Sequence, residues 1–299
     1  MEFFIVIFIA FLYFLYCGYG LYILATPIFL QPRVISVFVI LAWGMLLNII
    51  ISTNLFFLNI PLGKGIILVV ILASLIFFSA AYLKRAKFIL RPKQIFRVLC
   101  KYSSSSLLLV VALGIIISPG VRDGKNTVPF RIGIDQTAYS QSAQYLLEGF
   151  TRSKLIEELL VATGKSTFDQ SMLNKEHSLN FNTYVNADFL LQNRIGFQAI
   201  TVVICKIANI SHVYEWIFLG LILNFFLLFG FSFFFLRKVG PKSIKKYAFW
   251  FALLIIANCN LINVFYEGQY GQIFIVPFAV LVSLIHLNGK IQINKANST

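Results

Sequence analysis

The chain has 299 residues, of which 59% are hydrophobic and only 12% are charged, and its mean hydropathy is +0.84. Soluble domains carry about a quarter charged residues, so this composition excludes a soluble enzyme, and the four scattered cysteines exclude a disulfide-built secreted module. The net charge of +14 does not indicate nucleic-acid binding, because the basic residues border apolar runs instead of alternating with exposed aromatic residues.

Seven apolar stretches are suited to crossing the membrane as helices, and we predict an all-α integral membrane protein. The first stretch begins at Glu2 and lacks a small-residue cleavage site, so it is predicted to be a membrane span and not a cleavable signal peptide. In chain order the predicted spans are residues 3–26, 34–58, 65–83, 103–118, 213–236, 247–266 and 271–288.

Two loops are dense in lysine and arginine and contain no acidic residue: residues 84–101 and residues 237–246. Because positively charged loops are retained on the cytoplasmic side, we predict both loops there. The chain is then a multi-pass protein of the plasma (inner) membrane, with its N-terminus outside and its C-terminus in the cytoplasm. All eleven acidic residues fall on the external side of this arrangement.

The stretch 196–211 is apolar but contains Lys206, and counting it as a further span would place the basic loop 237–246 outside the cell. Its roughly 14 apolar-leaning residues are also too few for a full crossing. We therefore predict a re-entrant segment or a helix lying on the membrane surface.

The external loop, residues 119–195, has eight basic and eight acidic residues and is neutral overall. A helix is predicted at 136–147, closed by Gly149, with its apolar residues Tyr139, Ala143, Leu146 and Leu147 on one face. That face predicts a helix at the membrane surface. Residues 151–163 are predicted to form a second such helix, and residues 164–193 a polar, asparagine-rich loop.

Asp135 is the candidate catalytic residue, between the exit of a span and the predicted helix. A carboxylate near the bilayer and flanked by Ile132, Ile134 and Ala138 can have a raised pKa and act as a general base. The alternative is that Asp135 caps the helix that starts at Gln136, a role that aspartate fills well. The two roles are compatible.

Arg131 and Arg194 are candidate ligands of a phosphate, because the planar guanidinium group suits phosphate oxygens. The alternative is that both side chains reach ordinary lipid head groups. Glu267, Gln269 and Gln272 lie between two predicted spans and supply more polar groups than a tight turn requires, so they are candidates for substrate binding or for a plain hairpin turn. The three histidines are far apart and predict no metal cluster.

The motifs between about residues 115 and 275 resemble those of the GT-C superfamily, the multi-span glycosyltransferases that use polyprenyl-phosphate-linked sugars. The similar pieces are Gly133-Ile-Asp135-Gln-Thr-Ala-Tyr139, Tyr145-Leu-Leu-Glu-Gly149 and Arg194-Ile-Gly-Phe-Gln198. The turn from Glu267 to Gln272 is a weaker match. The resemblance divides the chain into an N-terminal three-span region, 1–101, and a GT-C-like region, 102–299.

The resemblance implies that Asp135 deprotonates or orients an acceptor hydroxyl of a glycan or lipid on the external face. Arg131 or Arg194 would stabilise the departing lipid phosphate, where negative charge develops. Tyr139, Gln198 and the turn residues Glu267, Gln269 and Gln272 would contribute to substrate binding. Some GT-C enzymes bind a divalent metal and others do not, and the single carboxylate of this motif favours no metal.

Three departures from the family pattern favour other readings. Gln136 follows Asp135 where a second acidic residue is common, Ile195-Gly196 replaces the usual Pro-Pro, and the chain has few spans for the family. A non-catalytic membrane subunit that binds lipid-linked glycan, working with a membrane protein partner, is the first alternative. A transporter of such lipids is the second, although Glu215 and Glu267 lie near span ends and not in mid-span.

Overall fold

The computed structural model describes residues 2–25, 35–84, 134–169, 186, 190–191, 195–213, 218–256, 275–284 and 286. The regular elements in these residues are all helices, as predicted. They include α1 (Glu2–Ala25), α2 (Ile35–Phe57), α3 (Leu62–Lys84), α6 (Ile134–Leu147), α7 (Arg152–Thr163), α9 (Gly196–Ile207), α10 (Phe218–Val239), α11 (Lys242–Lys246) and α12 (Ala248–Ile256).

Four helices in the described part of the chain are long and apolar enough to cross a membrane: α1, α2, α3 and α10. They coincide with four of the predicted spans, which confirms a multi-pass membrane protein. The predicted span 103–118 lies outside the described residues. The spans 247–266 and 271–288 are described only in part, as α12 and as a helix from Ile275 to Leu284.

Helices α1 and α2 pack in antiparallel directions at very close range. The Tyr13 hydroxyl donates to Oδ1 of Asn48 at 2.9 Å, and Gly18 lies against the backbone of Ile40. In the same crossing Gly44 lies against the carbonyl oxygen of Phe14. Small residues permit such an approach between membrane helices, where a buried hydrogen bond replaces lost contact with water.

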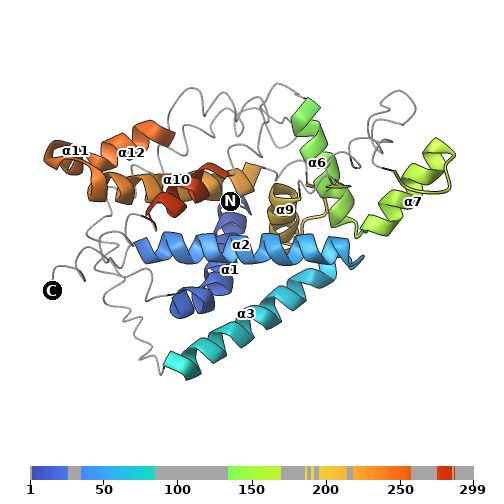
Figure 1. Ribbon diagram of the computed structural model, residues 1–299, viewed down its shortest axis with the longest axis horizontal. Coiled ribbons are helices and arrows are strands. Elements are labelled where there is room, and N and C mark those ends of the chain that lie inside the picture. Colours follow the sequence, from blue (N-terminus) through green and yellow to red (C-terminus); the bar gives the residue numbers. More distant parts are fainter. Residues whose placement is uncertain are drawn as a thin grey trace.

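Helix α10 runs alongside α2, also antiparallel to it (Figure 1). The Phe38 ring, near the start of α2, stacks on Phe226 of α10 with 4.7 Å between ring centroids. The beginning of α10 contacts α9 instead, where Gly220 lies against the Phe197 ring. Since Gly196 of α9 lies against Ile49 of α2, the short helix α9 occupies the space between α2 and the start of α10.

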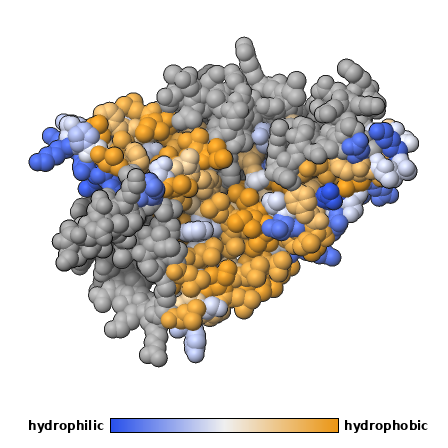
Figure 2. Space-filling model, in the orientation of Figure 1, coloured by the Kyte–Doolittle hydropathy of each residue, from blue (hydrophilic) through white to orange (hydrophobic). Residues whose placement is uncertain are grey.

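Polar residues of the described helices lie at two opposite ends of the molecule. Helices α6, α7 and α9 lie at the end where α2 stops and α3 begins, whereas α11 lies at the opposite end (Figure 1). The lysines of α11 are therefore far from α7. Figure 2 shows a hydrophobic surface between hydrophilic residues at α7 and at α11. Helix α3 exposes several large apolar side chains, such as Ile67, Leu75 and Phe78.

Helix α9 has 12 residues, which rise about 18 Å and are too few to cross the bilayer. Its residues 197–205 are all buried. Helix α6 buries the predicted face of Tyr139, Ala143, Leu146 and Leu147, and it also buries Ser140, Ser142 and Tyr145. It is thus enclosed on more sides than an amphipathic helix on a flat surface would be.

Two local expectations differ from the structure. The span predicted from residue 213 begins later in the structure, where α10 starts at Phe218. Val213 itself lies in a loop, and its backbone N–H donates to Oε1 of Gln144. Within the predicted loop 164–193, the described residues Asn186, Leu190 and Leu191 are helical. The polar composition around them gave no signal for a helix, but Leu190 is completely buried.

The hydrophobic core draws on both regions of the predicted division at residue 101. A single cluster of buried side chains includes Phe14 and Met45 from the N-terminal helices together with Leu146, Ile200 and Phe225 from the rest of the chain. The described parts of the two regions therefore pack as one body around α9.

Candidate functional site

Helices α6 and α9 pack side by side and run in the same direction. The Tyr139 ring, in the second turn of α6, meets the Phe197 ring, in the first turn of α9, edge-on, with 5.7 Å between centroids and 89° between planes. One turn further along α6, Oγ of Ser142 accepts a hydrogen bond from Nε2 of Gln198 at 3.4 Å. At their other ends Leu147 and Cys205 line the same cavity. The first turn of α9 therefore lies beside the second and third turns of α6.

Two of the predicted site residues, Tyr139 and Gln198, lie in this contact between α6 and α9. Asp135 is the second residue of α6, so its backbone lies in the first turn, but its side chain is outside the described part. Tyr139 follows one turn later, and Gln198 is the third residue of α9. The other predicted residues lie outside the described residues: Arg131, Arg194, Glu267, Gln269 and Gln272.

Gln198 is completely buried, with 0% of its surface exposed. Its Oε1 atom has no hydrogen-bond partner in the described structure. Leaving a buried acceptor unpaired costs about 1–3 kcal/mol. The neighbouring Ser142 is also completely buried, and its hydroxyl donates to the carbonyl oxygen of Ala138 at 2.7 Å.

Gln144 joins α6 to the loop after α9, a role that the sequence did not predict. Its Nε2 donates to Oε1 of Glu148 at 3.0 Å and to the carbonyl oxygen of Ser211 at 3.2 Å. Its Oε1 accepts the backbone N–H of Val213 at 3.0 Å. The sequence places Gln144 on the polar face of the helix, but it carries no signal for a partner nearly 70 residues away.

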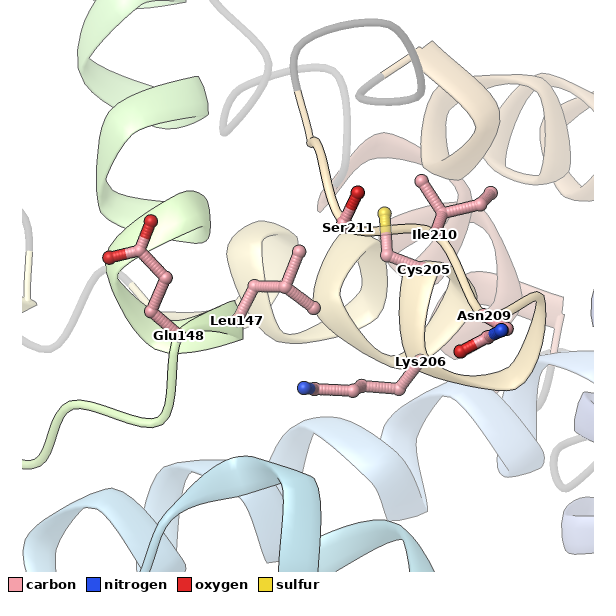
Figure 3. A pocket seen from close by; sticks show the side chains of 7 residues that line it. All are labelled: Leu147, Glu148, Cys205, Lys206, Asn209, Ile210 and Ser211. Atoms are coloured by element: carbon pink, nitrogen blue, oxygen red, sulfur yellow. The ribbon is translucent and has the colours of Figure 1, made fainter.

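A cavity of about 270 Å³ lies where α6 and α9 end (Figure 3). The side chain of Lys206 extends from α9 toward the end of α6, while the Glu148 carboxylate turns away from it (Figure 3). The lining residues are Leu147, Glu148, Cys205, Lys206, Asn209, Ile210 and Ser211. Ligand pockets for drug-sized molecules span roughly 300–1,000 Å³, so this cavity is smaller than such a pocket.

The α2–α3 turn holds α7 in place. Oδ1 of Asn59 accepts the backbone N–H of Ser153 at 2.7 Å, which caps the first turn of α7. The guanidinium of Arg152 lies over the Phe57 ring at 5.7 Å from its centroid, and Pro61 lies beside Gly149. Helix α7 and the turn before it are thereby tied to α2 and α3 through several contacts.

Tyr145, near the end of α6, is an uncharged group. Its ring stacks on Phe150 with 4.4 Å between centroids. Burial first, and then the nearby Glu158 carboxylate, raises the pKa of the Tyr145 hydroxyl above its ordinary value. The tyrosine therefore stays protonated at physiological pH and adds no negative charge to this part of the molecule.

Among the described residues no group of three or more histidine, cysteine, aspartate or glutamate side chains is placed to hold a metal ion. Comparison with family models, with curated proteins and with solved structures found no match to this chain. What the fold defines is thus a multi-pass, all-helical membrane protein with a buried polar contact between two parallel helices.

Proposed function

We propose that this protein is a membrane glycosyltransferase of the GT-C kind, which transfers a sugar from a polyprenyl-phosphate donor to a glycan or lipid acceptor on the external face. The parallel packing of α6 and α9 carries the proposal. Two of the sequence motifs that resemble the family, at residues 133–139 and 194–198, are separated by more than 50 residues in the chain. Their described members Tyr139, Phe197 and Gln198 lie in one interface.

The proposed chemistry begins with the acceptor hydroxyl. Asp135, in the first turn of α6, takes or orients its proton while the hydroxyl oxygen attacks the anomeric carbon. The bond from that carbon to the phosphate oxygen breaks, and the lipid phosphate leaves with the electron pair. Because negative charge grows on the phosphate, cationic and positively polarised groups near it accelerate the reaction.

The start of α9 supports phosphate binding near this contact. The N-terminus of a helix carries a partial positive charge and free N–H groups, and that of α9 lies beside the second and third turns of α6. Arg194 directly precedes Ile195, which is the N-cap of α9, and Arg131 precedes the first residue of α6 by three positions. These arginines are the proposed phosphate ligands, and no metal is required.

The proposed setting is the plasma (inner) membrane, with the N-terminus outside, seven spans and α9 as a re-entrant helix. The length of α9 and the location of α11 at the end opposite α7 support this topology. The alternative function is a non-catalytic membrane subunit that binds lipid-linked glycan. Gln136 favours it, because the family often has a second acidic residue at or near that position.

The test is mass spectrometry of surface glycans and polyprenyl-phosphate sugars in cells that lack the protein and in cells restored with variants. We expect wild type to restore one missing sugar and to remove its accumulated lipid-linked donor. We expect Asp135→Asn to lower transfer by about 100-fold or more, since general base catalysis contributes roughly 10²–10⁴-fold.

The control for this test is Glu157→Gln, which removes an exposed carboxylate from α7 and is expected to restore fully. Full restoration by Asp135→Asn at equal expression would contradict the general-base role and favour the subunit. Unchanged glycans in cells lacking the protein would rule out the transferase function and make lipid transport the next hypothesis.

A further inference from the structure

The buried amide of Gln198 has only one reasonable orientation. Ser142 has a single hydroxyl proton, and that proton is donated to the carbonyl oxygen of Ala138 at 2.7 Å. The Ser142 oxygen can therefore only accept from Gln198, which requires Nε2 of the amide at the contact of 3.4 Å. Exchanging the amide oxygen and nitrogen would bring two acceptors together. Oε1 must face away from Ser142.

This orientation leaves Oε1 as an acceptor without a donor in the described part of the chain, on a side chain with 0% exposure. Native proteins pair nearly all buried polar atoms, so such an atom calls for a donor that the described part of the chain does not supply. An O–H or N–H group of a bound molecule meets that need.

The surroundings of Gln198 favour a neutral hydroxyl group as the partner of Oε1 and disfavour an anion. Gln198 carries no charge, and an amide oxygen repels phosphate or carboxylate oxygens that have no proton to share. The aromatic rings of Tyr139 and Phe197 meet in the same interface, and they offer apolar faces instead of charge. A hydroxyl-bearing ring, such as a sugar, matches an acceptor amide beside aromatic groups.

We propose that Oε1 of Gln198 accepts a hydrogen bond from a hydroxyl of the sugar in the polyprenyl-linked donor, with Ser142 holding the amide in the required orientation. This inference rests on the proposed function. Since the amide is completely covered, the sugar reaches it only when α6 and α9 separate around Ser142 and Gln198. An ordered buried water is the competing donor.

The first experiment measures the melting temperature of purified Gln198→Met protein in detergent without added ligand. Methionine removes the buried acceptor and also the donor of the long 3.4 Å contact with Ser142. If Oε1 is unpaired in the free protein, relief of the unfavourable acceptor offsets the loss of that weak bond, and the melting temperature stays equal or rises. A fall of several degrees, or failure to fold, means that a water or an internal donor satisfies Oε1, which overturns the inference whatever the protein's function.

The control in this measurement is Thr201→Val, one turn further along α9. Thr201 is equally buried, but its hydroxyl donates to the carbonyl oxygen of Phe197 at 3.1 Å. This variant is expected to lower the melting temperature slightly, because a satisfied buried hydrogen bond is lost. The two buried polar residues should thus respond in opposite directions.

The second experiment uses native mass spectrometry with two probes, a polyprenyl phosphate that carries a hexose and the same lipid phosphate without sugar. We expect wild type and Thr201→Val to bind the sugar-bearing probe about tenfold more tightly, as one added hydrogen bond provides. Gln198→Met should lose this preference while binding the bare lipid phosphate as wild type does.

The outcomes separate the two hypotheses. If Gln198→Met keeps the sugar preference, the inference is wrong and the proposed function stands. If wild type binds both probes equally, the sugar is not recognised at Gln198 and the inference is likewise wrong. If wild type binds neither probe, the proposed function fails and takes the inference with it.

Discussion

Asn59 ends α2 in the left-handed backbone conformation, with φ of 60°. The N–H of Ile60 returns to the carbonyl oxygen of Leu55 at 2.8 Å, and that of Asn59 to Phe56 at 3.1 Å, the pair of bonds that defines a Schellman motif. Gly149, Gly164 and Asn209 close three other helices with the same pair of bonds and positive φ. Asparagine and glycine tolerate this conformation, which explains their use at these four helix ends.

The Asn59 side chain gives the first residue-scale prediction. Asn59→Gly keeps the backbone conformation but removes the acceptor of the Ser153 N–H, and the lost cap should cost about 1 kcal/mol. We expect faster amide hydrogen exchange across α7, measured by mass spectrometry, and restoration of protection by Asn59→Asp. Asn209→Gly is the control, since Asn209 shares the backbone conformation but its side chain does not cap α7. Unchanged exchange in Asn59→Gly would show that α7 is held by its other contacts.

At the scale of elements, the crossing of α1 and α2 depends on two glycines. A Cβ atom at Gly44 would overlap the carbonyl oxygen of Phe14, and one at Gly18 would overlap the carbonyl oxygen of Ile40. At each glycine, the backbone of the neighbouring helix occupies the space that a side chain would take. The hydrogen bond from Tyr13 to Asn48 lies in the same interface and depends on the same close approach.

We therefore expect Gly44→Ala to separate α1 from α2 and to lower the melting temperature in detergent, with a cost of about 1–3 kcal/mol or more from overpacking. The control is Gly63→Ala in the first turn of α3, where the nearest atom to an added Cβ is Cε of Lys206 at 3.5 Å. That substitution meets only a flexible side chain and should leave the melting temperature unchanged or slightly higher. Equal melting temperatures for Gly44→Ala and wild type would contradict the tight crossing.

At the scale of the whole molecule, the positions of α7 and α11 predict that these two helices lie on opposite sides of the membrane. Glu157 on α7 and Lys245 on α11 are both exposed and lie at opposite ends of the described structure. In a protein whose native cysteines are replaced by alanine, a membrane-impermeant maleimide should label Glu157→Cys in intact cells. Lys245→Cys should be labelled only after the membrane is permeabilised. Labelling of both positions in intact cells would refute a membrane between α7 and α11.

The sequence by itself determined where the long apolar helices of this protein lie. The apolar runs at 3–26, 34–58 and 65–83 predicted α1, α2 and α3 to within three residues, because membrane spans require continuous apolar length and little else. The helix ending at Gly149 was also predicted, since glycine in the left-handed conformation is a local property. The predicted locations of Asp135, Tyr139 and Gln198 near helix starts follow from the same local signals.

Only the tertiary structure decided which of these helices meet. The contact of Gln198 with Ser142, the three hydrogen bonds of Gln144 and the cap that Asn59 provides for α7 each join residues that are distant in the chain. Composition and periodicity report how much of a helix is apolar, but not which neighbour covers it. The choice of neighbour depends on the shape and polarity of two surfaces at once, and that pairing exists only when the whole chain has packed.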